Sequence, residues 1–135
     1  MPALVDTGAL LAISRKSDQY HARATAIAER HHRGGGSYMG TTLILGELHA
    51  HLLFLRGPAE ARAVVLRLLD DPAHTWLEVS ADLVRSAVQN WLQRFTDQDF
   101  SLVDAVSFEV MKRARLTHAF AFDHHFEVAG FRLLR

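Results

Sequence analysis

The sequence predicts an α/β protein with three layers, α/β/α, in which helices cover a central parallel sheet of four to five short strands. Short apolar segments alternate with longer segments of helical periodicity along the chain, and this alternation is typical of β-α-β units. Right-handed crossovers bring the carboxyl ends of parallel strands to one edge of the sheet, where ligands bind. The length, 135 residues, fits a single domain over residues 1–135.

Composition favours a folded protein and excludes disulfide bonds and thiolate metal sites. Hydrophobic residues make up 49% of the chain and the formal net charge is zero, so no overall basic charge indicates nucleic-acid binding. The absence of cysteine excludes disulfides and thiolate metal ligands. We expect no membrane span, because the apolar run Leu43–Leu55 is short and carries Glu47. We also expect no secretory signal at the N-terminus, and therefore a cytoplasmic location.

Local signals place the elements in the first half of the chain. The apolar run Ala3–Val5 suits a strand buried in the middle of a sheet, and Thr7 and Gly8 should turn the chain after it. Thr41 or Thr42 is a typical helix N-cap, while Gly57-Pro58 ends one helix and starts the next. In order, we expect a strand over residues 3–5, helices over 9–13 and 20–32, a strand over 37–40, and helices over 43–55 and 59–69.

The second half repeats the alternation. Thr75–Val79 is rich in residues that favour strands, and Ser80 can cap the helix that follows. A polar loop, Thr96–Asp99, separates that helix from the next one. The apolar run Ala119–Phe122 ends at Asp123. In order, we expect a strand over residues 75–79, helices over 80–95 and 102–115, a strand over 119–122, and a short last strand over 131–134.

The helix expected to begin at Leu102 carries an acid in its first turn. Ser101 is a good N-cap, and Asp104 lies three residues later, near the capping-box position. A helix dipole favours an anion there. These residues alone leave two interpretations open, a simple helix cap or a member of an active site.

Three further acids favour the active-site interpretation. Asp6 and Asp123 each follow an expected strand, so both should lie at the same edge of the sheet. Glu47 interrupts an apolar helical segment, where an unpaired carboxylate is costly. No cationic residue adjoins any of these acids or Asp104 in the sequence. If the four converge, raised pKa values or a bound cation must relieve their repulsion. Oxygen ligands alone favour Mg²⁺, with Mn²⁺ as the alternative.

These acids carry a resemblance to a known family. The order Asp6, Glu47, Asp104, Asp123 resembles the acidic signature of the PIN-domain family, and the whole chain is similar to VapC-type toxins. The most specific segments are Leu4–Leu10, Ser101–Phe108 and Ala121–Phe126. The resemblance implies a three-layer PIN-like fold and a divalent-metal-dependent endoribonuclease, the toxin of a toxin–antitoxin pair. It implies that the acidic cluster holds the metal, which activates a water for hydrolysis of RNA phosphodiester bonds.

The resemblance also implies supporting residues and partners. Thr7 and Ser101 match positions that orient the carboxylates or a water. Asp99 is either an outer acidic member or a solvated loop residue. The implied partners are RNA, a second copy of the chain in a homodimer, and a VapB-type antitoxin. The apolar helices near the N-terminus, around residues 10–13 and 22–28, could hold an antitoxin helix, although core packing explains the same residues.

The chain departs from the family pattern at two positions beside the last acid. Ala121 stands where many relatives have threonine, and His125 stands where many have a further aspartate. The second change puts in doubt a second metal site made only of carboxylates. His124 and His125 are instead candidates for contact with RNA or for general acid catalysis. No histidine pair has the spacing of a zinc site with a third ligand nearby.

Two other functions fit parts of the sequence. A non-catalytic PIN-like module that binds RNA or a partner would keep the fold, but the four acids would be costly without a metal. A receiver-like signalling domain would need a lysine at a strand end, and Lys16 and Lys112 are not at such positions.

Overall fold

A parallel sheet of five short strands forms the middle layer of the computed structural model, which describes residues 1–135. The strand order is β3-β2-β1-β4-β5, with β1 in the centre. Val5 pairs with Phe120 of β4, and Leu4 pairs with Met39 of β2, so β1 is bonded on both sides. The strands are β1 (Pro2–Val5), β2 (Ser37–Thr41), β3 (His74–Leu77), β4 (His118–Phe120) and β5 (Arg132–Leu133).

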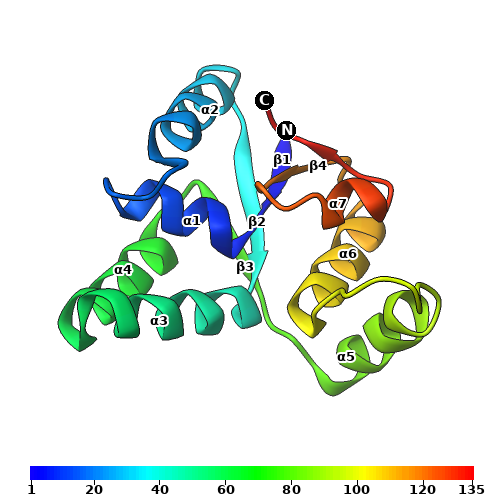
Figure 1. The fold of residues 1–135 in the computed structure, drawn as a ribbon. Helices are drawn as coiled ribbons and strands as arrows, with labels where there is room; N and C mark the ends of the chain where they lie inside the picture. Colours follow the sequence, from blue (N-terminus) through cyan, green and yellow to red (C-terminus); the bar gives the residue numbers. More distant parts are fainter.

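Helices cover both faces of the sheet, which confirms the three-layer α/β/α prediction (Figure 1). On one face lie α1 (Thr7–Ser14), α2 (His21–Arg33), α3 (Thr42–Arg56) and α4 (Pro58–Asp70). On the other face lie α5 (Ala81–Ala87), a π-helical segment η1 (Val88–Leu92), α6 (Leu102–Ala114) and α7 (His125–Val128). The two chain termini lie together at the end of the sheet where β1 begins. None of the helices has the length and apolar character that crossing a membrane requires.

The core lies between the sheet and the two helical layers. Phe108 of α6, Phe120 of β4 and Phe126 of α7 are the largest wholly buried side chains. The rings of Phe108 and Phe126 meet edge to face at 5.1 Å between centroids. Burial of a phenylalanine side chain stabilises a fold by about 1.5–3 kcal/mol, so these contacts anchor α6 and α7 against the sheet.

Capping residues start several helices where the sequence predicted. Thr41 caps α3 by accepting a hydrogen bond from the Ile44 amide, and Ser80 caps α5 in the same way from Leu83. Ser101 caps α6, and a complete capping box with Asp104 is present. Satisfying the free amides at a helix start in this way contributes about 1 kcal/mol per cap.

Several predicted boundaries were wrong and one helix was missed. Strand β3 ends at Leu77, two residues before the expected end. Thr7 and Gly8 form the first turn of α1 instead of a separate turn, because the Asp6 carbonyl already accepts a helical hydrogen bond from Leu10. The helix expected over 80–95 is α-helical only to Ala87 and then π-helical to Leu92. Strand β4 ends at Phe120, where its pairing with β1 stops, so Ala121 and Phe122 lie in the loop before Asp123. Helix α7 was not expected; its four residues carry no helical period.

The apolar surface lies only partly where we expected it. Leu10, Ala12, Ala24 and Ile27 of the N-terminal helices are buried in the core, so core packing accounts for them, whereas Ile13 is 39% exposed. Five of the ten large exposed apolar side chains lie on α3 and α4. They are Leu53, Phe54, Leu55, Leu66 and Leu69, and Phe54 is 89% exposed.

Candidate active site

A cleft of about 480 Å³ opens at the carboxyl edge of the sheet. Every predicted site residue except His124 lies on its wall. The lining residues are Asp6, Thr7, Gly8, Leu11, Glu47, His51, Asp99, Ser101, Asp104, Phe122, Asp123 and His125. The cleft therefore contains five carboxylates and no lysine or arginine.

The fold brings the four acids together from both helical layers. Asp6 directly follows the central strand β1, and Asp123 follows β4 after a short loop. Glu47 projects from the second turn of α3, where it is half-buried, and Asp104 stands in the first turn of α6. Helices α3 and α6 cover opposite faces of the sheet, so the acids converge across its edge (Figure 1).

Asp6 has the most strongly perturbed acidity in the cleft. The residue is 9% exposed. Burial, followed by repulsion from the Asp104 carboxylate, raises the pKa of Asp6 from 3.8 to about 7. Glu47 and Asp123 raise the pKa further, and a hydrogen bond from the Thr7 backbone partly opposes them. A buried carboxyl with three acidic neighbours favours either a proton or a cation.

Asp104 both completes the cap of α6 and lies on the wall of the cleft. One carboxylate oxygen, Oδ2, accepts the Ser101 amide at 3.0 Å, while the Asp104 amide donates to Ser101 Oγ at 3.0 Å. The same Oδ2 lies 3.2 Å from Nδ1 of His125. The cap fixes the carboxylate at the start of α6, where it faces the cleft.

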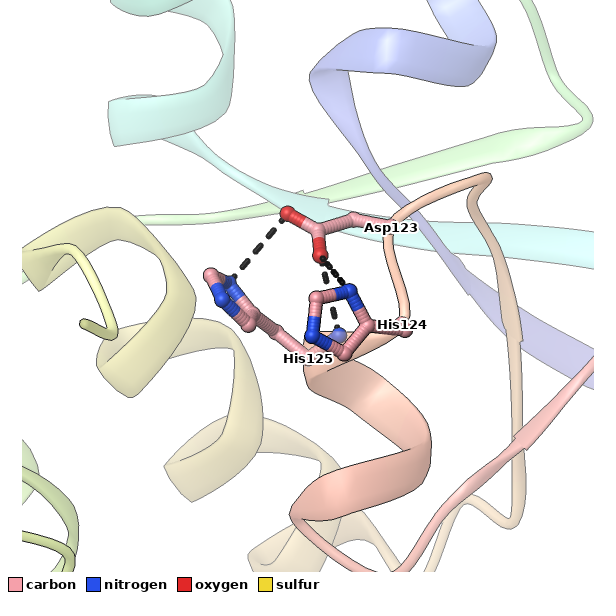
Figure 2. Close-up of side chains that lie close together, drawn as sticks. All are labelled: Asp123, His124 and His125. Atoms are coloured by element: carbon pink, nitrogen blue, oxygen red, sulfur yellow. Dashed lines mark hydrogen bonds and ion pairs between the residues drawn. The ribbon is translucent and has the colours of Figure 1, made fainter. Parts of the chain in front are cut away.

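His125 joins two of the acids. Its Nδ1 lies 3.2 Å from Asp104 Oδ2 and 3.3 Å from Asp123 Oδ2. Its backbone amide also donates to Asp123 Oδ1 at 2.9 Å, so the loop before α7 is tied to the acid it carries (Figure 2). His124 is exposed and lies 3.7 Å from Asp123 Oδ1 on the other side of that carboxylate. Asp123, His124 and His125 thus place three ligand atoms within 4.8 Å of one another.

The three residues predicted to support the acids, Thr7, Ser101 and Asp99, differ in burial. Thr7 is 4% exposed, and its Oγ1 is buried without a hydrogen-bond partner. Ser101 and Asp99 are exposed at the rim of the cleft. An unpaired buried hydroxyl is costly. Because Thr7 Oγ1 has no partner in the protein, it can donate to or accept from a group bound in the cleft.

The residues present fit a hard divalent cation. Four carboxylates supply the oxygen ligands that Mg²⁺ and Mn²⁺ prefer. The raised pKa of Asp6 and the unpaired hydroxyl of Thr7 are both conditions that a hydrated cation would relieve. The ring of His125 adds a nitrogen ligand beside Asp104 and Asp123.

Some lining residues had no predicted role in the cleft. Phe122 was assigned to a strand, and its place on the wall follows from the early end of β4. His51 lies one helical turn after Glu47, a spacing that indicates a shared face. Leu11 lies one turn after Thr7 on α1 by the same rule.

Comparisons with known proteins identify the family of this chain. A family model described as PIN domain matches residues 3–132. VapC20 of Mycobacterium tuberculosis strains H37Rv and CDC 1551, a 23S rRNA-specific endonuclease, is 45% identical over 53 residues, which is 39% of this chain and 40% of that protein. The chain thus matches less than half the length of that relative in sequence.

Solved structures extend the likeness to nearly the whole chain. The crystal structure of M. tuberculosis VapC20, described as a sarcin-ricin loop cleaving toxin, superposes with a TM-score of 0.82 at 31% identity, over 96% of this chain and 95% of that chain. VapBC2 from Rickettsia felis, bound to a DNA fragment from its promoter, gives a TM-score of 0.67 at 11% identity over 98% and 97% of the chains, a likeness of fold alone. The chain therefore belongs to the PIN-domain family, as its resemblance to VapC-type toxins predicted.

Proposed function

We propose that this protein is a divalent-metal-dependent endoribonuclease and the toxin of a toxin–antitoxin pair. The observation that carries the proposal is the convergence of Asp6, Glu47, Asp104 and Asp123 in one cleft that has no lysine or arginine. Burial and acidic neighbours raise the pKa of Asp6, so the site favours a proton or a cation, and a divalent cation would relieve the repulsion among all four acids. Its similarity to VapC20, an endonuclease specific for 23S rRNA, supports RNA as the substrate.

The four acids would hold Mg²⁺ or Mn²⁺, with Thr7, Ser101 and the outer acid Asp99 in support. A divalent ion in such a site supplies Lewis-acid stabilisation of negative charge on a phosphate and lowers the pKa of water. The protein orients the carboxylates: the capping box fixes Asp104, and the His125 amide fixes Asp123. His125 also holds these two carboxylates together through Nδ1, which keeps them in place before the ion arrives.

Metal-dependent cleavage of RNA tests the enzymatic part. Purified protein free of any partner should cut RNA with Mg²⁺ or Mn²⁺ and stop when EDTA is added. A hairpin with the sarcin-ricin loop sequence is the first substrate to try, because VapC20 cleaves that loop. Undiminished cleavage in EDTA would rule out the metal mechanism. Failure to cut that hairpin or any cellular RNA would favour the alternative, a non-catalytic PIN-like module.

We infer that the antitoxin is VapB-type and covers the exposed apolar face of α3 and α4. A shallow hollow of about 370 Å³ there is lined by Glu47, Ala50, His51, Phe54 and Leu55. It shares Glu47 and His51 with the acidic cleft, so an apolar segment seated on Phe54 would extend toward the site it must block. We further propose that the protein acts in the cytoplasm as a homodimer, by analogy with the family.

Growth tests the role as a toxin. Expression of the protein alone should arrest growth, and co-expression of a small antitoxin encoded by the neighbouring gene should restore it. Phe54→Glu should weaken rescue without loss of cleavage, because it places a charge on the apolar face. Normal growth at confirmed levels of active, folded protein would contradict the role as a toxin.

A further inference from the structure

The acidic cleft lacks the cations that an RNA backbone requires. Its wall holds five carboxylates, and its only basic side chains are the two histidines, His51 and His125. Proteins that bind single-stranded RNA combine cationic groups for the phosphates with aromatic rings for the bases. A substrate of the proposed ribonuclease must therefore find such groups at the rim of the cleft.

Phe122, on the wall of the cleft, contacts an aromatic ring and a cation outside the cleft. The ring of Phe122, which directly precedes Asp123, stacks on the ring of Tyr20 with centroids 4.6 Å apart and planes within 10°. The guanidinium carbon of Arg23 lies over the Phe122 ring at 5.4 Å from its centroid. Tyr20 and Arg23 come from the start of α2, and Phe122 comes from the loop after β4. We name these three residues the aromatic rim.

Two residues of the aromatic rim, Tyr20 and Arg23, are exposed, while Phe122 is half-buried, and the charge of Arg23 is unpaired. Tyr20 keeps 38% of its surface accessible although Phe122 covers its ring, and Arg23 is also exposed. No carboxylate lies within ion-pair distance of Arg23, whereas Arg56 and Arg113 are paired with Glu60 and Glu109. The Tyr20 backbone is fixed, because its amide donates to Asp18 Oδ1 at 2.8 Å. A fixed aromatic face beside an unpaired cation is suited to a base and its phosphate.

We propose that Tyr20, Phe122 and Arg23 form a nucleotide-binding subsite for single-stranded RNA, next to the phosphate that is cut. An unpaired base stacks on the outer face of Tyr20, and Arg23 contacts the adjoining phosphate. The subsite rests on the proposed function for its substrate, and it explains how a cleft lined by acids holds a polyanion. It also gives Phe122 a role beyond packing, since that residue links the subsite to the metal-binding acid Asp123.

Binding of labelled RNA tests the subsite apart from catalysis. In a background carrying Asp104→Asn to suppress cleavage, fluorescence anisotropy would measure a fluorescein-labelled single-stranded oligoribonucleotide, with the sarcin-ricin hairpin in parallel. Tyr20→Leu keeps an apolar contact with Phe122 but removes the stacking face, and should weaken binding at least about fivefold. Tyr20→Phe should restore it. Arg23→Gln should weaken binding and reduce the slope of log affinity against log salt by about 1.

Arg85→Gln is the matched control. Arg85 is an exposed, unpaired arginine on α5, in the opposite helical layer, and its removal changes the net charge equally. Thermal melts would identify any variant that fails to fold, and Arg23→Gln, at an exposed site, is not expected to. Equal RNA binding by Arg23→Gln and Arg85→Gln would overturn the subsite. So would variants at Tyr20 and Arg23 that bind RNA normally but lose the antitoxin, because the rim would then be a protein-binding surface. A wild type that binds RNA through the rim yet cuts none with Mg²⁺ or Mn²⁺ would leave the subsite standing and contradict the proposed function.

Discussion

Asp6 connects the stability of the metal-free protein to pH. Its pKa is raised from 3.8 to about 7, chiefly by burial and then by repulsion from Asp104. Between these two values the folded state binds more protons than the unfolded state, so stability falls as pH rises through this window. Below this pH window, the Asp6 carboxyl is protonated in both the folded and the unfolded state, so the cost of burying its negative charge is absent.

We therefore expect Asp6→Asn to flatten this dependence. The wild type should lose up to about 4 kcal/mol of unfolding free energy relative to Asp6→Asn between about pH 4 and 7, at about 1.36 kcal/mol per pKa unit. Urea melts in EDTA across this range would measure the difference. Asp97→Asn, at an exposed loop acid, is the control and should run parallel to the wild type. A wild type that gains stability over Asp6→Asn as pH rises would contradict the crowded cluster.

His125 offers a second test at the residue scale. Its ring nitrogen lies 3.2 and 3.3 Å from Asp104 and Asp123, at a position where the family resemblance places aspartate. His125→Asp should lower the stability of the metal-free protein, because another carboxylate adds repulsion. It should also enlarge the rise in melting temperature caused by Mg²⁺, because it adds an oxygen ligand. His124→Asp is the control, because His124 is exposed and lies outside the cleft wall. It should enlarge the Mg²⁺-induced rise in melting temperature less than His125→Asp does.

The four acids could be predicted from the sequence, but the contacts of His125 could not. Asp6 and Asp123 follow apolar strands, and parallel strands must bring their ends together. The capping box left the role of Asp104 open, and the order of the four acids, which resembles the PIN-domain signature, identified it as a site candidate. The position of His125 depends on α7, a helix of four residues without an apolar period, so no local pattern indicates that its ring turns toward Asp104.

At the scale of the secondary-structure elements, the π-helical segment η1 was the hardest to predict from the sequence. From the Ser80 cap we expected one continuous helix over residues 80–95, and the sequence has no proline or glycine there to indicate a change. The structure ties this segment to α6 through Glu109. Asn90 and Trp91 both donate to Glu109 Oε1 at 3.1 Å, and Arg113 donates to Oε2 at 2.8 Å.

Removal of the Glu109 carboxylate should destabilise this element. Burial alone would raise the pKa of Glu109, but the hydrogen bonds from Asn90, Arg113 and Trp91 outweigh it and lower the pKa. The ionised Glu109 carboxylate therefore stabilises the fold at pH values above its unfolded pKa, near 4.5. This stabilisation is lost as the pH falls through the lower pKa that Glu109 has in the folded state. Glu109→Ala should cost about 1–3 kcal/mol at neutral pH, because the buried Trp91 donor loses its partner.

Glu60→Ala is the matched control for Glu109. Both glutamates accept a hydrogen bond from Nε of an arginine four residues away on the same helix, but the Glu60 side chain is 36% exposed and that of Glu109 only 5%. An exposed pair of this kind is worth about 0.3–0.5 kcal/mol. Urea melts should separate the two variants clearly. Equal losses would mean that burial and the Trp91 contact add nothing.

At the scale of the whole molecule, the cleft connects the two helical layers. Glu47 belongs to α3 on one face of the sheet, Asp104 belongs to α6 on the other, and Asp6 follows the central strand between them. The four acids come from segments spread over most of the chain. A cation bound by all of them would therefore stabilise the folded state as a whole, since unfolding separates its ligands.

This coupling gives the last prediction, which uses Asp104→Asn. An asparagine side chain at position 104 keeps an oxygen that can accept the Ser101 amide in the capping box, so the variant loses a dipole interaction of about 0.3–1 kcal/mol and the charge that faces His125. Relief of repulsion at Asp6 offsets that loss, so the metal-free variant should be no less stable than the wild type. Mg²⁺ at about 100 times its dissociation constant should stabilise the wild type by about 2.7 kcal/mol, and Asp104→Asn much less.

Thermal melts with and without Mg²⁺, beside an RNA cleavage assay, would measure both effects. Cleavage should collapse in Asp104→Asn, because the ion loses a ligand that positions it against phosphate. Asp99→Asn, at an exposed acid of the cleft rim, should keep most of the Mg²⁺ stabilisation and of the activity. An Asp104→Asn protein that is destabilised without metal, yet binds Mg²⁺ and cuts RNA like the wild type, would reduce Asp104 to a helix cap. The link between the two helical layers would then have to pass through Asp6, Glu47 and Asp123 alone.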